Sequence, residues 1–115
     1  MNMNKIKELI QDFSSNRDWE EFHNPKNLSM ALSVEVSELL EIFQWLSLEE
    51  ADNLPKDKHE HAKQEIADVA IYLIRMCMKL DINLEDAIKE KMILNEKKYP
   101  LYDKNGNKIV YGKKA

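Results

Sequence analysis

Apolar residues recur at helical spacing along most of the chain, and they predict four helices. The expected helices cover about residues 3–14, 25–46, 57–80 and 84–99. Asn24 can cap the second helix, Pro25 suits its first position, and Asn83 can cap the fourth. Only two glycines and three prolines interrupt the chain, and β-branched residues are sparse. The pattern therefore favours an all-α fold over a sheet.

The segments outside these helices are polar. Residues 47–57 break the periodicity with Pro55 and several acidic side chains, so we expect a connection without regular structure there. The polar, basic tail, residues 101–115, is expected to be either flexible or a short hairpin that Asn105-Gly106 closes. With no internal repeat and no visible boundary, we expect one helical domain over residues 1–100 followed by this tail.

Length and composition restrict the function further. A chain of 115 residues suits one compact domain but builds a deep pocket poorly on its own, which favours a homo-oligomer. The net charge of −4 and the lack of a basic run before the tail disfavour a nucleic acid polymer as partner. A small polyanion that is held through a divalent cation remains compatible with this charge.

The location of the protein is expected to be cytoplasmic. The single cysteine, Cys77, cannot form an intrachain disulfide, which fits a reducing compartment, and we expect it to pack as a small hydrophobe. The first ten residues contain no apolar run of signal-peptide length. No stretch approaches the ~20 apolar residues of a membrane span, so a membrane partner is not expected.

A glutamate stands where the second helix should be apolar. The apolar stripe of this helix is formed by Leu28, Leu32, Leu39 and Leu46. Glu35 projects only about 20° from the centre of that stripe, since each helical residue turns by about 100°. Glu38 is three residues further on, so the two side chains are neighbours and repel each other. A bound cation would compensate both the burial and the repulsion.

The third helix carries a matching pair, Glu65 and Asp68, on the shoulder of its apolar stripe, with Tyr72 projecting between them. If the two helices pack side by side, four carboxylates converge, and oxygen-only ligands suit Mg²⁺ or Mn²⁺. Glu41 lies about 120° from Glu35 and either faces outward, supports the ligands or acts as a base.

Other acidic pairs and the histidines are interpreted differently. The pairs Glu20-Glu21, Glu49-Glu50 and Glu85-Asp86 are expected to lie on solvated helix faces. A di-iron site is excluded because it needs Glu-x-x-His on two helices, and histidine follows neither Glu35 nor Glu65 at that spacing. His59 and His61 are two residues apart, point to different faces, and are expected on the surface.

Four segments together resemble the dCTP pyrophosphatase branch of the MazG-like nucleotide pyrophosphohydrolases. They are Arg17-Asp18-Trp19 through Leu28, Glu35-Val36-Ser37-Glu38 through Trp45, Glu65-Ile66-Ala67-Asp68 through Leu73, and Lys91-Met92 through Asn95 to Lys98-Tyr99-Pro100. The resemblance covers about residues 5–100. It implies an all-α, four-helix MazG-like bundle that assembles as a dimer or as a tetramer made of two dimers.

The same resemblance implies a site. The metal ligands would be Glu35, Glu38, Glu65 and Asp68, which would hold Mg²⁺. The nucleotide site would be lined by Trp19, His23, Trp45 and Tyr72. This chain departs from the family by having Val34 and Ser37 where relatives often have small residues, frequently glycine, and Ile10 where some have histidine. These departures bear on base selectivity and leave the expected metal site unchanged.

The expected reaction is water attack at the α-phosphorus of a nucleoside triphosphate, with dCTP or a modified dCTP as the leading substrate and pyrophosphate as the leaving group. One of the four carboxylates, or Glu41, would accept the proton of the water. On the fourth helix, Lys91, Asn95 and Lys98 share one face and can hold phosphates, as can Arg17. Either His23 or Asn27 can hydrogen-bond a pyrimidine edge.

Two non-catalytic functions are the alternatives. One is a helical interaction module whose acidic face binds a partner, and the other is a nucleotide sensor that binds without cutting. The interaction module gives no reason for a charge at Glu35, in the middle of the protein's own apolar stripe, so this position favours the enzyme.

Overall fold

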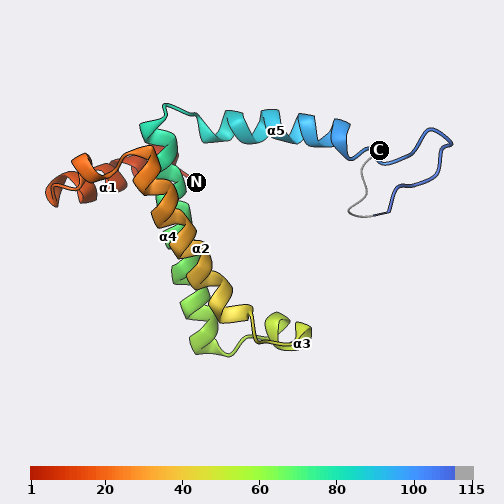
Figure 1. Ribbon diagram of the computed structural model, residues 1–115, viewed down its shortest axis with the longest axis horizontal. Helices are drawn as coiled ribbons and strands as arrows, with labels where there is room; N and C mark the ends of the chain where they lie inside the picture. The colour runs from red at the N-terminus through yellow and green to blue at the C-terminus, as the bar shows by residue number, and fades with distance from the viewer. Residues whose placement is uncertain (111–115) are drawn as a thin grey trace. The chain divides into compact units, whose positions relative to one another are not determined.

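The computed structural model describes residues 1–110, and helices dominate that range. The elements are α1 (Met3–Asn16), the 3₁₀ turn η1 (Glu20–Phe22), α2 (Pro25–Phe43), α3 (Leu48–Asp52), α4 (Lys56–Lys79) and α5 (Leu84–Lys98) (Figure 1). The prediction of an all-α fold is confirmed. The one β feature in residues 1–110 is an isolated antiparallel bridge between Tyr102 and Lys108.

The helix starts follow from local capping chemistry. The side chain of Asn24 accepts a hydrogen bond from the backbone N–H of Asn27 at 2.9 Å, and Pro25 occupies the first helical position of α2. Asn83 caps α5 through the backbone N–H of Asp86 at 3.0 Å. Each cap satisfies a backbone donor that has no partner inside its own helix.

The segment after α2 differs from its prediction. The second helix ends at Phe43 and not near Leu46, and residues 48–52 form the short helix α3 where a connection without regular structure was expected. Ser47 explains both differences, because it forms a reciprocal capping box with Glu50. Its extended backbone ends the preceding turn, and its hydroxyl begins the next helix.

The chain forms two compact units, Met1–Asp81 and a second one from Ile82 onward. In the first unit, α2 packs along α4, and α1 packs against α4 as well (Figure 1). The buried apolar side chains of this unit are Ile10, Leu28, Ala62, Ile74 and Cys77. The expected burial of Cys77 is confirmed.

In the second unit, residues 101–110 of the tail fold back after α5, and residues 111–115 of the predicted tail lie outside the described range. The backbone N–H of Ile109 donates to the carbonyl oxygen of Leu101 at 2.9 Å, beside the bridge between Tyr102 and Lys108. The turn holds Gly106 at a φ of +80°, a conformation that costs glycine little. The carboxylate of Asp103 accepts from two backbone N–H groups of this turn, each at 2.9 Å.

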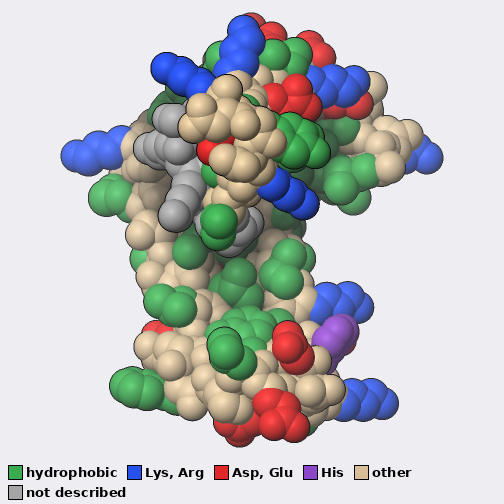
Figure 2. All heavy atoms as spheres, turned by 90° about the vertical axis from the view of Figure 1, so that its right-hand side faces the viewer, with side chains coloured by type: hydrophobic (Ala, Val, Ile, Leu, Met, Phe, Trp, Pro, Cys, Tyr) green, Lys and Arg blue, Asp and Glu red, His purple; other side chains and the backbone are tan. Residues whose placement is uncertain are grey.

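Large apolar side chains also reach the surface, as the face in Figure 2 shows in green. On α2, Val36 is 47% and Leu40 59% exposed, and on α4, Ile66 is 55% exposed. No helix within the described part of the chain is both long and apolar enough to cross a membrane.

Candidate metal and nucleotide site

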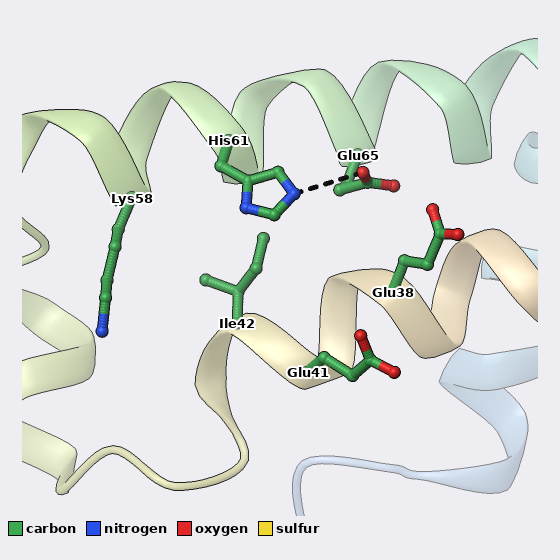
Figure 3. Close-up of a pocket in the computed structure, with 6 residues that line it drawn as sticks. All are labelled: Glu38, Glu41, Ile42, Lys58, His61 and Glu65. Carbon is green, nitrogen blue, oxygen red and sulfur yellow. Dashed lines mark ion pairs between the residues drawn. The ribbon is translucent and has the colours of Figure 1, made fainter.

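Three glutamates converge between α2 and α4. Glu35 and Glu38 lie one turn apart on α2, and Glu65 faces them from α4. One carboxylate oxygen from each residue lies within 4.8 Å of the other two. Figure 3 shows the carboxylates of Glu38 and Glu65 turned toward the space between the two helices. The pairing of α2 with α4 therefore brings three of the four predicted ligands together.

The burial of this cluster makes its negative charge costly. Glu65 is 9% exposed, and Glu35 is half-buried. Among residues 1–110, neither Oε2 of Glu35 nor Oε2 of Glu65 has a hydrogen-bond partner. Burial, followed by the neighbouring Glu38, Glu65 and Asp68, raises the pKa of Glu35 from 4.5 to about 7. Partnerless carboxylate oxygens that face one another are a donor set that fits a hard divalent cation.

Asp68, the fourth predicted ligand, lies close enough to Glu35 to raise its pKa but is not a member of the three-glutamate cluster. Together with residues of α1, Asp68 and Tyr72 line a pocket that does not include the three glutamates. The pKa of the Tyr72 hydroxyl is raised by burial first, and then by the charges of Glu35 and Asp68. Asp68 therefore lies between the glutamates and this second pocket.

A pocket opens beside the glutamates and measures about 560 Å³. Its lining comes from α2 and α4 and consists of Glu38, Glu41, Ile42, Lys58, His61 and Glu65 (Figure 3). We call it the acidic pocket. Glu41, whose orientation the sequence left open, is exposed and lines this pocket.

Two residues of the acidic pocket were missed by the sequence interpretation. His61 was expected to be a surface residue, and its side chain is indeed 58% exposed, but its Nε2 lies 3.4 Å from Oε1 of Glu65. The signal that could have revealed it is the i,i+4 spacing of His61 and Glu65, which places both on one helix face. Lys58 lies one turn before His61 and brings a positive charge to the same pocket.

The second pocket lies between α1, the segment after it and α4, and measures about 610 Å³. We call it the aromatic pocket, and its lining is Ile6, Leu9, Ile10, Phe13, Ser14, Trp19, His23, Asp68, Ile71, Tyr72 and Arg75. Trp19 meets Phe13 edge to face, with ring centroids 5.4 Å apart, and lies 5.7 Å from the ring of His23. Apolar walls with a few polar groups are typical of a site for a small organic ligand.

A buried arginine is part of the lining of the aromatic pocket. Arg75 is 2% exposed. It donates to Oε1 of Gln11 at 2.7 Å, to Nδ1 of His23 at 3.3 Å and to Oε1 of Glu20. The sequence interpretation missed this residue, although the signal was present. A cation that lies between apolar neighbours on the buried side of a helix needs a partner.

Glu20 is that partner; its side chain is 38% exposed, as a solvated position requires, but its ion pairs were not predicted. Besides Arg75, it accepts hydrogen bonds from Nζ of Lys79 at 2.8 Å and Nε2 of Gln11 at 2.6 Å. The bond from Lys79, then those from Arg75 and Gln11, lower the pKa of Glu20 to about 2 against the opposing effect of burial. Glu50 likewise has a structural role, as the capping partner of Ser47.

Other predicted binding residues lie outside the lining of both pockets. Arg17 packs over the ring of Phe13, with 3.5 Å from Cζ to the ring centroid. Asn27 donates its side-chain amide to the carbonyl oxygen of Phe22 at 3.0 Å. Trp45 is 87% exposed. The fourth-helix residues Lys91, Asn95 and Lys98 lie on α5, in the second unit. Contacts of these six residues with nucleotide stay predictions.

Residues 30–113 match the sequence pattern of the MazG-like family. The chain belongs to the MazG-like family. The resemblance read from the sequence is therefore confirmed, and the matched range spans the positions of the four predicted metal ligands, whose role stays a prediction.

Relatives of this MazG-like chain have related names. It is 37% identical over 108 residues to the dCTP pyrophosphatase 1 of Mus musculus, which covers 92% of this chain and 64% of the relative. The match to the dCTP pyrophosphatase 1 of Homo sapiens is 38% identical over 99 residues and covers 84% of this chain and 58% of the relative. The chain thus spans less than two thirds of the length of these relatives.

A solved structure agrees in fold. The crystal structure of a pyrophosphatase from Archaeoglobus fulgidus DSM 4304 is similar with a TM-score of 0.82 and 42% sequence identity. The match covers 87% of this chain and 94% of that one. This similarity supports the arrangement of helices that brings the glutamates together.

Proposed function

We propose that this chain is a Mg²⁺-dependent nucleoside triphosphate pyrophosphohydrolase, which hydrolyses a (deoxy)nucleoside triphosphate to the monophosphate and pyrophosphate. The observation that carries the proposal is the cluster of Glu35, Glu38 and Glu65, with two buried oxygens that lack a hydrogen-bond partner in the described chain. The names of the relatives support dCTP or a modified dCTP as the leading substrate.

The proposed cation would be held by Glu35, Glu38 and Glu65, with Asp68 as a fourth ligand. The all-oxygen donor set supports Mg²⁺, for which Mn²⁺ can substitute. When bound, the ion supplies charge neutralisation of the triphosphate and activation of the attacking water. The raised pKa of Glu35 supports this assignment, because a cation would replace the proton that otherwise relieves the repulsion.

The protein's own groups would position the substrate and move the proton. Water attacks the α-phosphorus, the bond from that phosphorus to the bridging oxygen breaks, and its electron pair leaves with pyrophosphate. Glu41, or one of the clustered glutamates, accepts the proton of the water. Lys58 and His61 line the same pocket and can offset negative charge on the phosphates.

The nucleobase would enter the aromatic pocket. Trp19 and Tyr72 offer flat apolar faces, and His23 offers a polar ring edge. Asp68 lines this pocket and also influences Glu35, so a substrate could span from the aromatic pocket to the glutamates. The size of the pocket, about 610 Å³, lies within the range of small-ligand sites.

We further propose a homo-oligomer, with a tetramer favoured over a dimer, in the cytoplasm. The exposed apolar side chains Val36, Leu40 and Ile66 on the packed helices α2 and α4 support self-association, because monomers rarely expose large contiguous apolar patches. The lone, buried Cys77 fits a reducing compartment. Light scattering during size-exclusion chromatography tests the assembly, and a monomeric mass would contradict it.

The deciding experiment measures pyrophosphate release from a panel of (deoxy)nucleoside triphosphates, with Mg²⁺ or with a chelator. We expect turnover in Mg²⁺, none in chelator, and the highest kcat/KM on dCTP or a modified dCTP. Glu65→Gln should abolish turnover, whereas Glu60→Gln, an exposed position on the same helix, should keep it. Absence of turnover, with thermal stability indifferent to the chelator, would refute the enzyme. Mg²⁺-dependent nucleotide binding without product would indicate a sensor.

A further inference from the structure

The arginine that lines the aromatic pocket has more hydrogen-bond partners than a simple ion pair requires. Arg75 extends from α4 and reaches three different side chains, Gln11 on α1, Glu20 on η1, and His23 in the segment before α2. Charge balance needs only Glu20. The bond from Nε of Arg75 to Nδ1 of His23 is additional, and it acts on a residue that itself lines the pocket.

This bond determines where the imidazole carries its proton. The guanidinium group can only donate hydrogen bonds, so Nδ1 of His23, 3.3 Å from Nε of Arg75, has to accept. The hydroxyl of the buried Ser14 lies 3.5 Å from the same nitrogen and can donate to it too. A neutral imidazole whose Nδ1 accepts carries its hydrogen on Nε2.

The surroundings also keep His23 neutral. Burial, and then the positive charge of Arg75, lower the pKa of the His23 imidazole, with Lys79 acting in the same direction and Glu20 in the opposite one. Protonation would place a second N–H directly against the Arg75 guanidinium, which has no acceptor to offer. Among the residues that the structure describes, none is hydrogen-bonded to Nε2 of His23.

We propose that Arg75 is a positioning residue for base selectivity, because it holds His23 as the tautomer that presents a hydrogen-bond donor, Nε2–H, to an acceptor atom of the nucleobase. This inference rests on the proposed function. It predicts a preference for bases that present a carbonyl oxygen or an unprotonated ring nitrogen at this point. A base that presents an amino group or a ring N–H there is disfavoured, because two donors would face each other.

The first test reads the tautomer directly and does not depend on activity. Nitrogen-15 NMR of histidine-labelled protein distinguishes a protonated from an unprotonated ring nitrogen, and a His23→Gln variant assigns the signal. In the native protein we expect Nε2 to be protonated and Nδ1 unprotonated at neutral pH. A proton on Nδ1, or rapid exchange between both tautomers, overturns the proposal.

The second test asks whether Arg75 causes this state. Arg75→Lys keeps a positive charge for Glu20 but lacks the planar set of donors that reaches His23 at the same time. We expect the His23 signals to shift toward a mixture of tautomers. Lys79→Gln is the matched control, because Lys79 also bonds Glu20 but makes no hydrogen bond to His23. In this variant the tautomer of His23 should stay as in the native protein. An unchanged tautomer in Arg75→Lys overturns the proposal.

The third test measures selectivity by titration calorimetry with the non-hydrolysable α,β-methylene analogues of the four deoxynucleoside triphosphates in Mg²⁺. In Arg75→Lys, the ratio of affinities between the best and the worst base should fall about tenfold, the effect of about one hydrogen bond. A changed tautomer with an unchanged ratio overturns this inference alone. Failure of the native protein to bind any analogue overturns the proposed function and this inference together.

Discussion

Two glutamates of the first unit, Glu20 and Glu35, have neighbouring charges of opposite sign. Glu20 meets two cations of the protein itself, Arg75 and Lys79, and its pKa falls to about 2. Glu35 meets two further glutamates, and its pKa rises to about 7. Burial opposes ionisation in both places, so the sign of the neighbouring charge decides the result.

The difference separates a structural cluster from a candidate functional one. The Glu20 cluster is complete within the chain, since each of its carboxylate oxygens has a donor. The Glu35 cluster has two buried oxygens without a partner in the described residues, and a cation from outside would complete it. A strongly shifted pKa alone does not identify a functional site, because both clusters have one. The distinguishing feature is the pair of buried carboxylate oxygens that have no hydrogen-bond partner in the described residues.

The largest expected effect comes from removing one charge of the incomplete cluster. Glu38→Gln keeps the size of the side chain but removes a ligand charge, so we expect turnover to fall at least about 1,000-fold, or about 4 kcal/mol in the barrier. Pyrophosphate release with saturating Mg²⁺ measures this. Glu8→Gln, an exposed position on α1, should keep the native rate. A rate for Glu38→Gln within tenfold of the native one would remove Glu38 from the ligand set.

The next effect comes from breaking the complete cluster. Glu20→Gln leaves the buried guanidinium of Arg75 without its anion, and we expect the free energy of unfolding to fall by about 3 kcal/mol. Urea denaturation measures the loss. Glu21→Gln changes an exposed neighbour and should stay within about 0.5 kcal/mol of the native protein. A loss of equal size in both variants would mean that Glu20 has no special role in neutralising Arg75.

A smaller effect appears when pH is varied in the presence of a chelator. The pKa of Glu35 is raised from 4.5 to about 7 in the folded state, so its stabilising contribution is present below pH 4.5 and is lost as pH rises through about 7. At pH 8 without metal, Glu35→Gln should therefore melt roughly 5 °C above the native protein. Mg²⁺ should raise the Tm of the native protein but not that of the variant. Equal responses to Mg²⁺ would contradict the role of Glu35 as a ligand.

The smallest effect is the opposite pH trend of Glu20. Its pKa is lowered, so its contribution is present above pH 4.5 and is lost as pH falls toward about 2. The stability difference between the native protein and Glu20→Gln should shrink by about 1 kcal/mol between pH 5 and pH 3, a modest value because the side chain is 38% exposed. Urea midpoints at the two pH values measure this stability difference. A difference that grows on acidification would contradict the lowered pKa of Glu20.

Much of the fold followed from local sequence. The caps at Asn24 and Asn83 and the apolar periodicity gave the long helices, because helical spacing and capping are properties of neighbouring residues. The short helix α3 was missed because its segment is polar and lacks apolar periodicity. Ser47 and Glu50 nevertheless carry a capping-box pattern, which is typical of a helix start.

The candidate site was predicted less completely. Glu35 and Glu65 stood out because charges interrupt apolar stripes, and the structure brings them together with Glu38. Arg75 and Glu20 were missed because they are 55 residues apart, and no local pattern links them. His61 was missed because its contact depends on the i,i+4 spacing to Glu65, whereas the prediction rested on its spacing to His59.

The sequence by itself determined where helices form and which carboxylates oppose burial, since both depend on residues within one or two turns of each other. Only the tertiary structure decided which charges meet. The packing of α2 on α4 gathers like charges that need an external cation, whereas the approach of η1 to α4 gives Arg75 its anion. The physical reason is that the energy of a buried charge depends on its distance in space to other charges. That distance cannot be read from the positions of the residues along the chain.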